Sequence, residues 1–152
     1  IQDKKSKVGV NTHLTNKIVL HALENNLIKK FNKEIKIKPE TKYGSSTRFD
    51  FLITKKNLKI FLEVKNVTLS RVNGLAEFPD AITSRGLKHI NELINAGQEG
   101  YKIFILFLIQ RDDCKYFSIA KDIDIEYSNS FSEFNTISSL HTILSLFPNI
   151  LN

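Results

Sequence analysis

Three ionisable residues lie close together in two neighbouring apolar segments of the sequence. Asp50 lies in the stretch RFDF, and Glu63 and Lys65 are separated by one residue in the stretch LEVK. Two carboxylates and one ammonium suit phosphodiester hydrolysis, because Mg²⁺ prefers carboxylate oxygens and leaves positions for water and phosphate. The metal acidifies a water molecule, and a lysine orients that water or stabilises the developing negative charge. The alternative is a solvent-facing strand with an Arg48–Glu63 ion pair worth less than about 1 kcal/mol.

A β-hairpin is expected to bring these residues together. Residues 48–53 and 58–65 alternate between apolar and polar types, as half-buried strands do, and TKKN between them has a length typical of a hairpin turn. Pairing Ile53 with Leu58 keeps one face of the hairpin apolar, which fixes the register. The other face then gathers the three ionisable residues, with the two carboxylates on diagonal positions about 7 Å apart between backbones.

The remaining segments predict an α/β fold in which a mixed central sheet is flanked by helices. The order α-β-β-β-α-β-β-α indicates a single domain over residues 1–152. The expected elements are a helix from Thr15 or Asn16 to about Lys30, an edge strand at 34–38 ended by Pro39, the hairpin, a Gly-containing loop at 71–80, a helix capped by Thr83, a central strand at 101–110, a short strand at 114–119 and a helix from Ser132 to Pro148.

The charge balance favours a polyanionic partner. Lys and Arg number 22 and Asp and Glu number 16, which gives a net charge of +6. A basic protein attracts nucleic acid through counterion release, although the same lysines also serve solubility alone. Because 18 of the 22 basic residues are Lys, the composition favours diffuse attraction over bidentate recognition.

Composition also bears on the compartment. Cys114 is the only cysteine, so an internal disulfide is excluded and a reducing compartment is favoured. The longest apolar run, at 103–109, is too short to span a membrane, and the first residues lack the apolar stretch of a signal peptide. We therefore expect a cytoplasmic protein without a membrane partner. The chain starts at Ile1 and contains no Met, so we expect that an N-terminal portion is absent.

Several blocks resemble the sugar fermentation stimulation protein family of bacteria. They are VNTHLTNKIV, RFDF, FLEVKNVTL and FPDAITSRGLKHINEL, and they follow in the family's order from about Val8 to Phe131. The resemblance implies a restriction-endonuclease-like core of the PD-(D/E)xK type, preceded in the family by an OB-like domain that this chain lacks. The stretch 132–152 matches less well and is expected to form a divergent C-terminal helix.

The resemblance also assigns roles to individual residues. It makes Asp50 the metal-binding aspartate of the motif, Glu63 its second acidic residue and Lys65 its lysine, with Phe49 in the place of the proline. On weaker grounds Glu40 is a further metal ligand. The metal implied is Mg²⁺, for which Mn²⁺ would substitute.

Three basic side chains of the block FPDAITSRGLKHINEL are expected to share one face of a helix. Arg85, Lys88 and His89 follow at i, i+3 and i+4, so they share one face of a helix. Together with Arg48 they predict a surface that holds a DNA phosphate backbone beside the acidic site. The same residues also fit a solvated helix face without a ligand.

Two functions are considered at this point, and DNA binding is the one that we expect. The first is a DNA-binding protein that regulates sugar (maltose) metabolism on a nuclease-like core. The second is a Mg²⁺-dependent DNA endonuclease or exonuclease that uses Asp50, Glu63 and Lys65. A fragment that does neither is a third option, and the quaternary structure is left open, with a homodimer among the arrangements considered.

Overall fold

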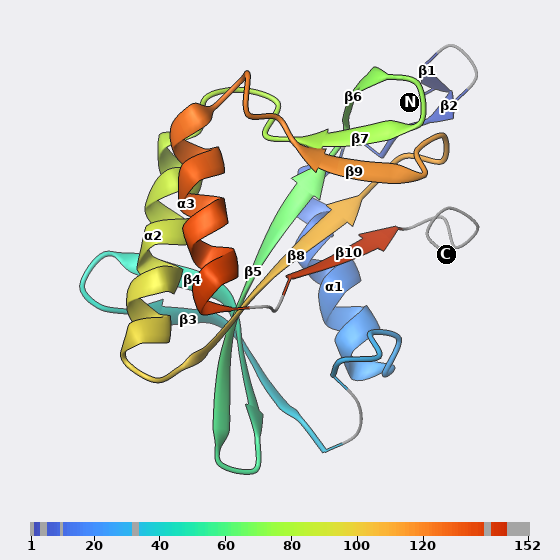
Figure 1. Ribbon diagram of the computed structural model, residues 1–152. Coiled ribbons are helices and arrows are strands. Elements are labelled where there is room, and N and C mark those ends of the chain that lie inside the picture. The colour runs from blue at the N-terminus through green and yellow to red at the C-terminus, as the bar shows by residue number, and fades with distance from the viewer. Residues whose placement is uncertain (1, 4–5, 10, 32–33, 139–140, 146–152) are drawn as a thin grey trace.

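The computed structural model describes residues 2–3, 6–9, 11–31, 34–138 and 141–145. Helices cover both faces of a five-stranded central sheet, with α2 and α3 side by side on one face and α1 on the other (Figure 1). The helical elements are η1 (Thr12–Leu14), α1 (Thr15–Glu24), α2 (Ser84–Gln98) and α3 (Ile125–Ile137). The strands are β1 (Gln2–Asp3), β2 (Ser6–Lys7), β3 (Lys36–Tyr43), β4 (Thr47–Lys55), β5 (Leu58–Val67), β6 (Leu69–Val72), β7 (Leu75–Phe78), β8 (Lys102–Ile109), β9 (Tyr116–Ile119) and β10 (His141–Ser145).

The central sheet has the strand order β10-β8-β5-β4-β3. Strands β3, β4 and β5 are antiparallel neighbours, whereas β8 runs parallel to both β5 and β10, so the sheet is mixed as predicted. Strand β8 is buried along nearly its whole length, because its odd positions pack under α2 and α3 and its even positions under α1. Its continuous apolar run is typical of a strand covered on both faces.

The predicted hairpin forms, but its register and turn differ from the expectation. The turn is the pair Lys56–Asn57 rather than the four residues TKKN, and Ile53 pairs with Ile60 instead of Leu58. Lys56 adopts a φ of 52°, which allows the tight two-residue turn that hairpins prefer. Because the register moves by two residues, the paired side chains from Phe51 to Leu62 stay on their predicted faces, and alternation alone does not distinguish the two pairings. Phe49 departs from the prediction, since it packs on the face opposite Phe51.

Strand β3 lies at the sheet edge as predicted, but Pro39 does not end it. The strand continues to Tyr43, with Pro39 opposite Phe51. Proline is tolerated here because a residue of an edge strand need not donate a ladder hydrogen bond.

Helix α1 is shorter than predicted, since Asn26 adopts a φ of 56° just beyond the last helical residue.

The expected C-terminal helix from Ser132 is wrong. Helix α3 instead begins at Ile125, where the carboxylate of Asp124 accepts from the backbone N–H of Tyr127. It ends at Ile137, and the hydroxyl of Ser138 then donates to the carbonyl of Ile103 at 2.8 Å. The chain continues as strand β10 beside β8, so pairing with an open sheet edge prevails over the helical spacing of apolar residues. Residues 146–152 lie outside the described residues.

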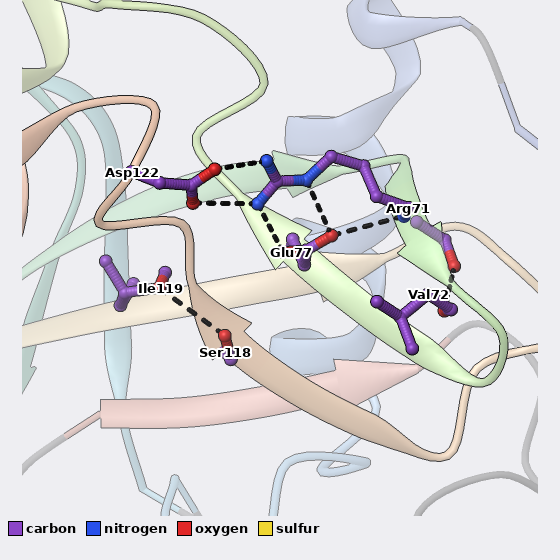
Figure 2. Close-up of polar contacts among 7 residues, drawn as sticks. Arg71, Val72, Glu77, Ser118, Ile119 and Asp122 are labelled. Carbon is purple, nitrogen blue, oxygen red and sulfur yellow. Dashed lines mark hydrogen bonds and ion pairs between the residues drawn. The ribbon is translucent and has the colours of Figure 1, made fainter.

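The predicted loop at 71–80 is a hairpin in a second, three-stranded sheet. Strands β6 and β7 pair antiparallel, and β9 joins β7 in parallel. Figure 2 shows Arg71 holding this sheet to the segment before α3, because its guanidinium donates to both Glu77 and Asp122. Asp124 extends the connection by accepting from the backbone N–H of Thr83, at the start of α2. Asp124 therefore ties the N-terminal ends of α2 and α3 to each other, and Arg71 ties the small sheet to the segment that precedes α3.

Candidate functional site

The site forms where strands β4 and β5 separate. Their regular pairing ends at Phe51 and Leu62. The first residues of β4, from Thr47 to Phe49, pair with β3 alone. Phe49 joins the core under α2 and α3, whereas Phe51 belongs to the core under α1, so the chain changes face at Asp50. The Asp50 side chain bridges the opening, because its Oδ2 accepts from the backbone N–H of Val64 at 2.7 Å.

Asp50 and Glu63 reach this opening from different directions. The carboxylate of Asp50 also accepts from Asn16 of α1 at 2.8 Å, on the face opposite the one on which Glu63 contacts α2. Burial first and the negative charge of Glu63 second raise the pKa of Asp50 from 3.8 to about 6. The two carboxylates are therefore close enough to interact, but they are not the flat diagonal pair that the sequence predicts.

Glu63 and Lys65 form a buried ion pair. Glu63 is 4% exposed and Lys65 is 9% exposed, and the ammonium donates to Glu63 Oε1 at 2.9 Å. His89 Nδ1 lies 2.6 Å from the same oxygen and donates to it, since an ionised carboxylate can only accept. Burial alone would raise the pKa of Glu63, but Lys65 and then His89 outweigh it and hold that pKa below its ordinary value.

The donor set suits a hard divalent cation with an incomplete protein shell. Glu63 Oε2 is buried and has no hydrogen-bond partner, which is costly unless a ligand or cation meets it. Among the described residues, no three His, Cys, Asp or Glu side chains converge into a closed metal cage. Mg²⁺ is commonly held by one or two carboxylates with water and phosphate completing its octahedron, so Asp50 and Glu63 fit this type of site.

An open groove lies beside this pair and contains the four residues predicted to bind DNA. It has a volume of about 500 Å³ and is lined by Ser46, Arg48, Ser84, Arg85, Lys88 and His89. Arg48 comes from β4 and the other three from α2, and Lys88 Nζ donates to Ser46 Oγ at 3.0 Å across the groove. His89 lines the groove and also contacts Glu63, so it connects the cationic surface to the acidic site.

Arg48 does not form the ion pair that was considered from the sequence, and it lies beside Glu40 instead. The ion pair between Arg48 and Glu63 does not form, since Arg48 pairs with Lys42 across the sheet and lies 3.9 Å from the carboxylate of Glu40. Glu40 is an exposed residue of β3, with 75% of its side chain accessible. Its role as a metal ligand stays a prediction.

Sequence reasoning missed the contribution of α1 to the site. Asn16 was expected only at the start of a helix, yet its amide donates to Asp50. Gln110, at the end of β8, donates to both Thr15 and Asn66 and anchors the same turn of α1. The polar character of these residues at strand and helix ends was the available signal, but it is too common to identify a site.

None of the helices in the described part of the chain combines the length and apolar character needed to cross a bilayer.

Comparisons with known proteins place this geometry in a family. The model of the sugar fermentation stimulation protein RE domain matches residues 13–138. The sugar fermentation stimulation protein homolog of Pelagibacter ubique is 53% identical over 131 residues, which cover 86% of this chain and 56% of that protein. The homolog of Bartonella henselae is 39% identical over 156 residues, covering 97% of this chain and 66% of that protein.

A solved structure supports the same assignment. The structure of Pyrococcus furiosus SfsA in complex with Ca²⁺ matches with a TM-score of 0.84 at 26% identity, covering 95% of this chain and 61% of that one. The predicted fold class, a restriction-endonuclease-like α/β core, is confirmed. The chain spans between 56% and 66% of the length of these three relatives. By the family model, the curated relatives and the fold, this chain belongs to the sugar fermentation stimulation protein family.

Proposed function

We propose that this protein binds the phosphate backbone of DNA, with the groove beside Glu63 as the contact surface. The observation that carries the proposal is the convergence of Arg48, Arg85, Lys88 and His89 on one groove. These side chains come from a strand and a helix that are distant in sequence, so the fold concentrates the charge on one surface. A net charge of +6 adds long-range attraction. The family resemblance makes regulation of sugar (maltose) metabolism the proposed cellular context.

The groove favours backbone contacts over base reading. Arg and Lys side chains that line an open surface hold phosphates in position but carry no sequence information by themselves. The hydroxyls of Ser46 and Ser84 add neutral donors of the kind that also contact phosphate. The groove therefore supports binding that depends strongly on salt and weakly on sequence.

Binding of a DNA duplex is tested at several salt concentrations with Arg85→Ala and Lys88→Ala variants. Each lost charge-assisted contact costs roughly 1.5–3 kcal/mol, which is about tenfold or more in affinity. Each should also lower the slope of log affinity against log salt by about 0.9. Lys59→Ala is the matched control, because Lys59 is exposed but lies outside the groove. Equal losses for Lys59→Ala, or an affinity that does not change with salt, would exclude the groove.

A second function, Mg²⁺-dependent cleavage of DNA, is favoured by the unpartnered Glu63 Oε2. Asp50 and Glu63 would hold the cation, for which Mn²⁺ would substitute. When bound, the cation would acidify a water molecule and neutralise charge on the phosphate. Lys65 keeps Glu63 ionised in the absence of metal, and its remaining N–H groups can donate to a phosphate oxygen. The groove would hold the adjacent phosphates of the strand and exclude other orientations of the backbone.

Cleavage is tested by incubating supercoiled plasmid with the protein and Mg²⁺ or Mn²⁺. Nicking should stop in Lys65→Ala and in Asp50→Asn, while duplex binding without metal is retained. Nicking that persists in the variant carrying both substitutions would place the chemistry elsewhere. Duplex binding without nicking at any metal concentration would refute the cleavage function and retain only the binding function.

A further inference from the structure

The first turn of α1 lies against the acidic site. Asn16, the second residue of the helix, directs its side-chain amide at Asp50 Oδ1, with 2.8 Å between nitrogen and oxygen. The backbone N–H of Val64 meets the other oxygen, Oδ2, at 2.7 Å. Two donors from different elements therefore fix both oxygens of this carboxylate and set its rotation about the side-chain bonds.

Both donors are neutral, which distinguishes Asp50 from Glu63. Oε1 of Glu63 is engaged by the ammonium of Lys65 and by His89. The two groups that donate to Asp50, an amide and a peptide N–H, carry no charge, although the positive charge of Lys65 also acts on this carboxylate. Each carboxylate oxygen accepts about two hydrogen bonds, so Asp50 keeps lone pairs available for a cation.

The turn that carries Asn16 is fixed to the sheet. Gln110 Nε2 donates to Thr15 Oγ1 at 3.2 Å and to Asn66 Oδ1, and both Thr15 and Gln110 are buried. Asn66 and Gln110 stand at the carboxyl ends of the parallel strands β5 and β8, where ligand sites of α/β sheets commonly form. Gly9 packs so closely on Gln110 that an added Cβ would lie 2.3 Å from its Oε1.

We propose that Asn16 is a positioning residue of the divalent-cation site, which orients Asp50 and thereby sets the affinity of the site for Mg²⁺. This inference rests on the metal site described under Proposed function. Hydrogen-bond partners of metal-ligating side chains typically change metal affinity by 10- to 100-fold when removed. The amide of Asn16 has the geometry of such a partner, because it meets Asp50 directly and is carried by a helix docked through a separate contact.

The test measures Mg²⁺ and Ca²⁺ affinity by calorimetry, without DNA, for the wild type, Asn16→Ala, Thr15→Val and Asn25→Ala. Asn16→Ala should weaken cation binding about 10- to 100-fold. Thr15→Val removes the contact with Gln110 but leaves the amide at Asp50, so its effect should be smaller. Asn25→Ala at the other end of α1, where the side chain bonds to His21, should leave affinity unchanged. Thermal unfolding without metal reports the stability cost of each variant separately.

The outcomes separate this inference from the proposed site. If the wild type binds the cations and Asn16→Ala binds them equally well, only the role of Asn16 fails. If Asn16→Ala and Thr15→Val weaken binding equally, the effect belongs to the docking of the turn and the positioning role is overturned. If the wild type binds neither cation, the metal site fails and the inference fails with it.

Discussion

Replacing Asp50 by Asn should stabilise the folded protein at neutral pH. Burial first and Glu63 second raise the pKa of Asp50 from 3.8 to about 6. Between these two pH values the folded state binds more protons than the unfolded state, so stability falls as pH rises through this window. About two pH units at 1.36 kcal/mol each give a cost of roughly 3 kcal/mol for the ionised carboxylate above pH 6. Asparagine removes that charge.

The hydrogen bonds around Asp50 tolerate the substitution. The oxygen of the new amide can accept from the backbone N–H of Val64, and its nitrogen can donate to Asn16 once the Asn16 amide turns over. The protein should therefore gain roughly 3 kcal/mol above pH 6 without losing a contact. For a domain of this size that corresponds to an increase in Tm of roughly 6–12 °C.

The assay is urea unfolding of the wild type and Asp50→Asn at pH 7.5 and pH 3.5. The gain should be present at pH 7.5 and should largely disappear at pH 3.5, where Asp50 is mostly protonated in both states. Asp80→Asn is the control, because Asp80 is an exposed residue before α2 and its replacement should leave stability unchanged. No gain at pH 7.5, or the same gain at both pH values, would refute the argument that Asp50 is held at the expense of stability.

Two further substitutions test the neighbouring contacts. Lys65→Met should destabilise the protein by roughly 2–4 kcal/mol, because it leaves the buried Glu63 carboxylate with His89 as its partner. In a urea titration, adding Glu63→Gln to this variant should recover most of the lost stability. Failure of the second substitution to restore stability would contradict the buried ion pair. Glu77→Gln should weaken the attachment of Arg71 shown in Figure 2, so amides of β6 and β7 should exchange hydrogen faster while those of α2 stay protected. A uniform increase across the chain would indicate global destabilisation instead.

Local patterns predicted several elements well. The apolar run of β8 and the N-cap Thr83, whose hydroxyl accepts from the backbone N–H of Gly86, are found where the sequence places them. The C-terminal segment was predicted wrongly because its apolar spacing fits a helix, and the open edge of β8 that receives β10 exists only after the sheet has formed. The β6–β7 hairpin was missed because its strands are short and flank a glycine.

Local patterns likewise predicted some features of the candidate site but not others. Residue type and spacing identified Asp50, Glu63 and Lys65, and the helical spacing of Arg85, Lys88 and His89 placed them on one face. How the carboxylates are arranged was not available from these patterns. A shift of the hairpin by two residues keeps the same alternation of apolar and polar positions, so alternation cannot select the observed register. Alternation also placed Phe49 and Phe51 on one face, whereas they pack in cores on opposite faces of the sheet.

The sequence by itself determined which residues are candidates for the site and that β8 is covered on both faces, since both follow from side-chain type and from the periods of helix and strand. The tertiary structure alone decided where β4 leaves β5 and which side chains meet in the opening. Asn16 of α1 contacts Asp50, which lies 34 positions away in the sequence, and His89 of α2 contacts Glu63, which lies 26 positions away. The two helices cover opposite faces of the sheet. Contacts of this kind depend on how layers pack, and no local pattern of residues encodes that packing.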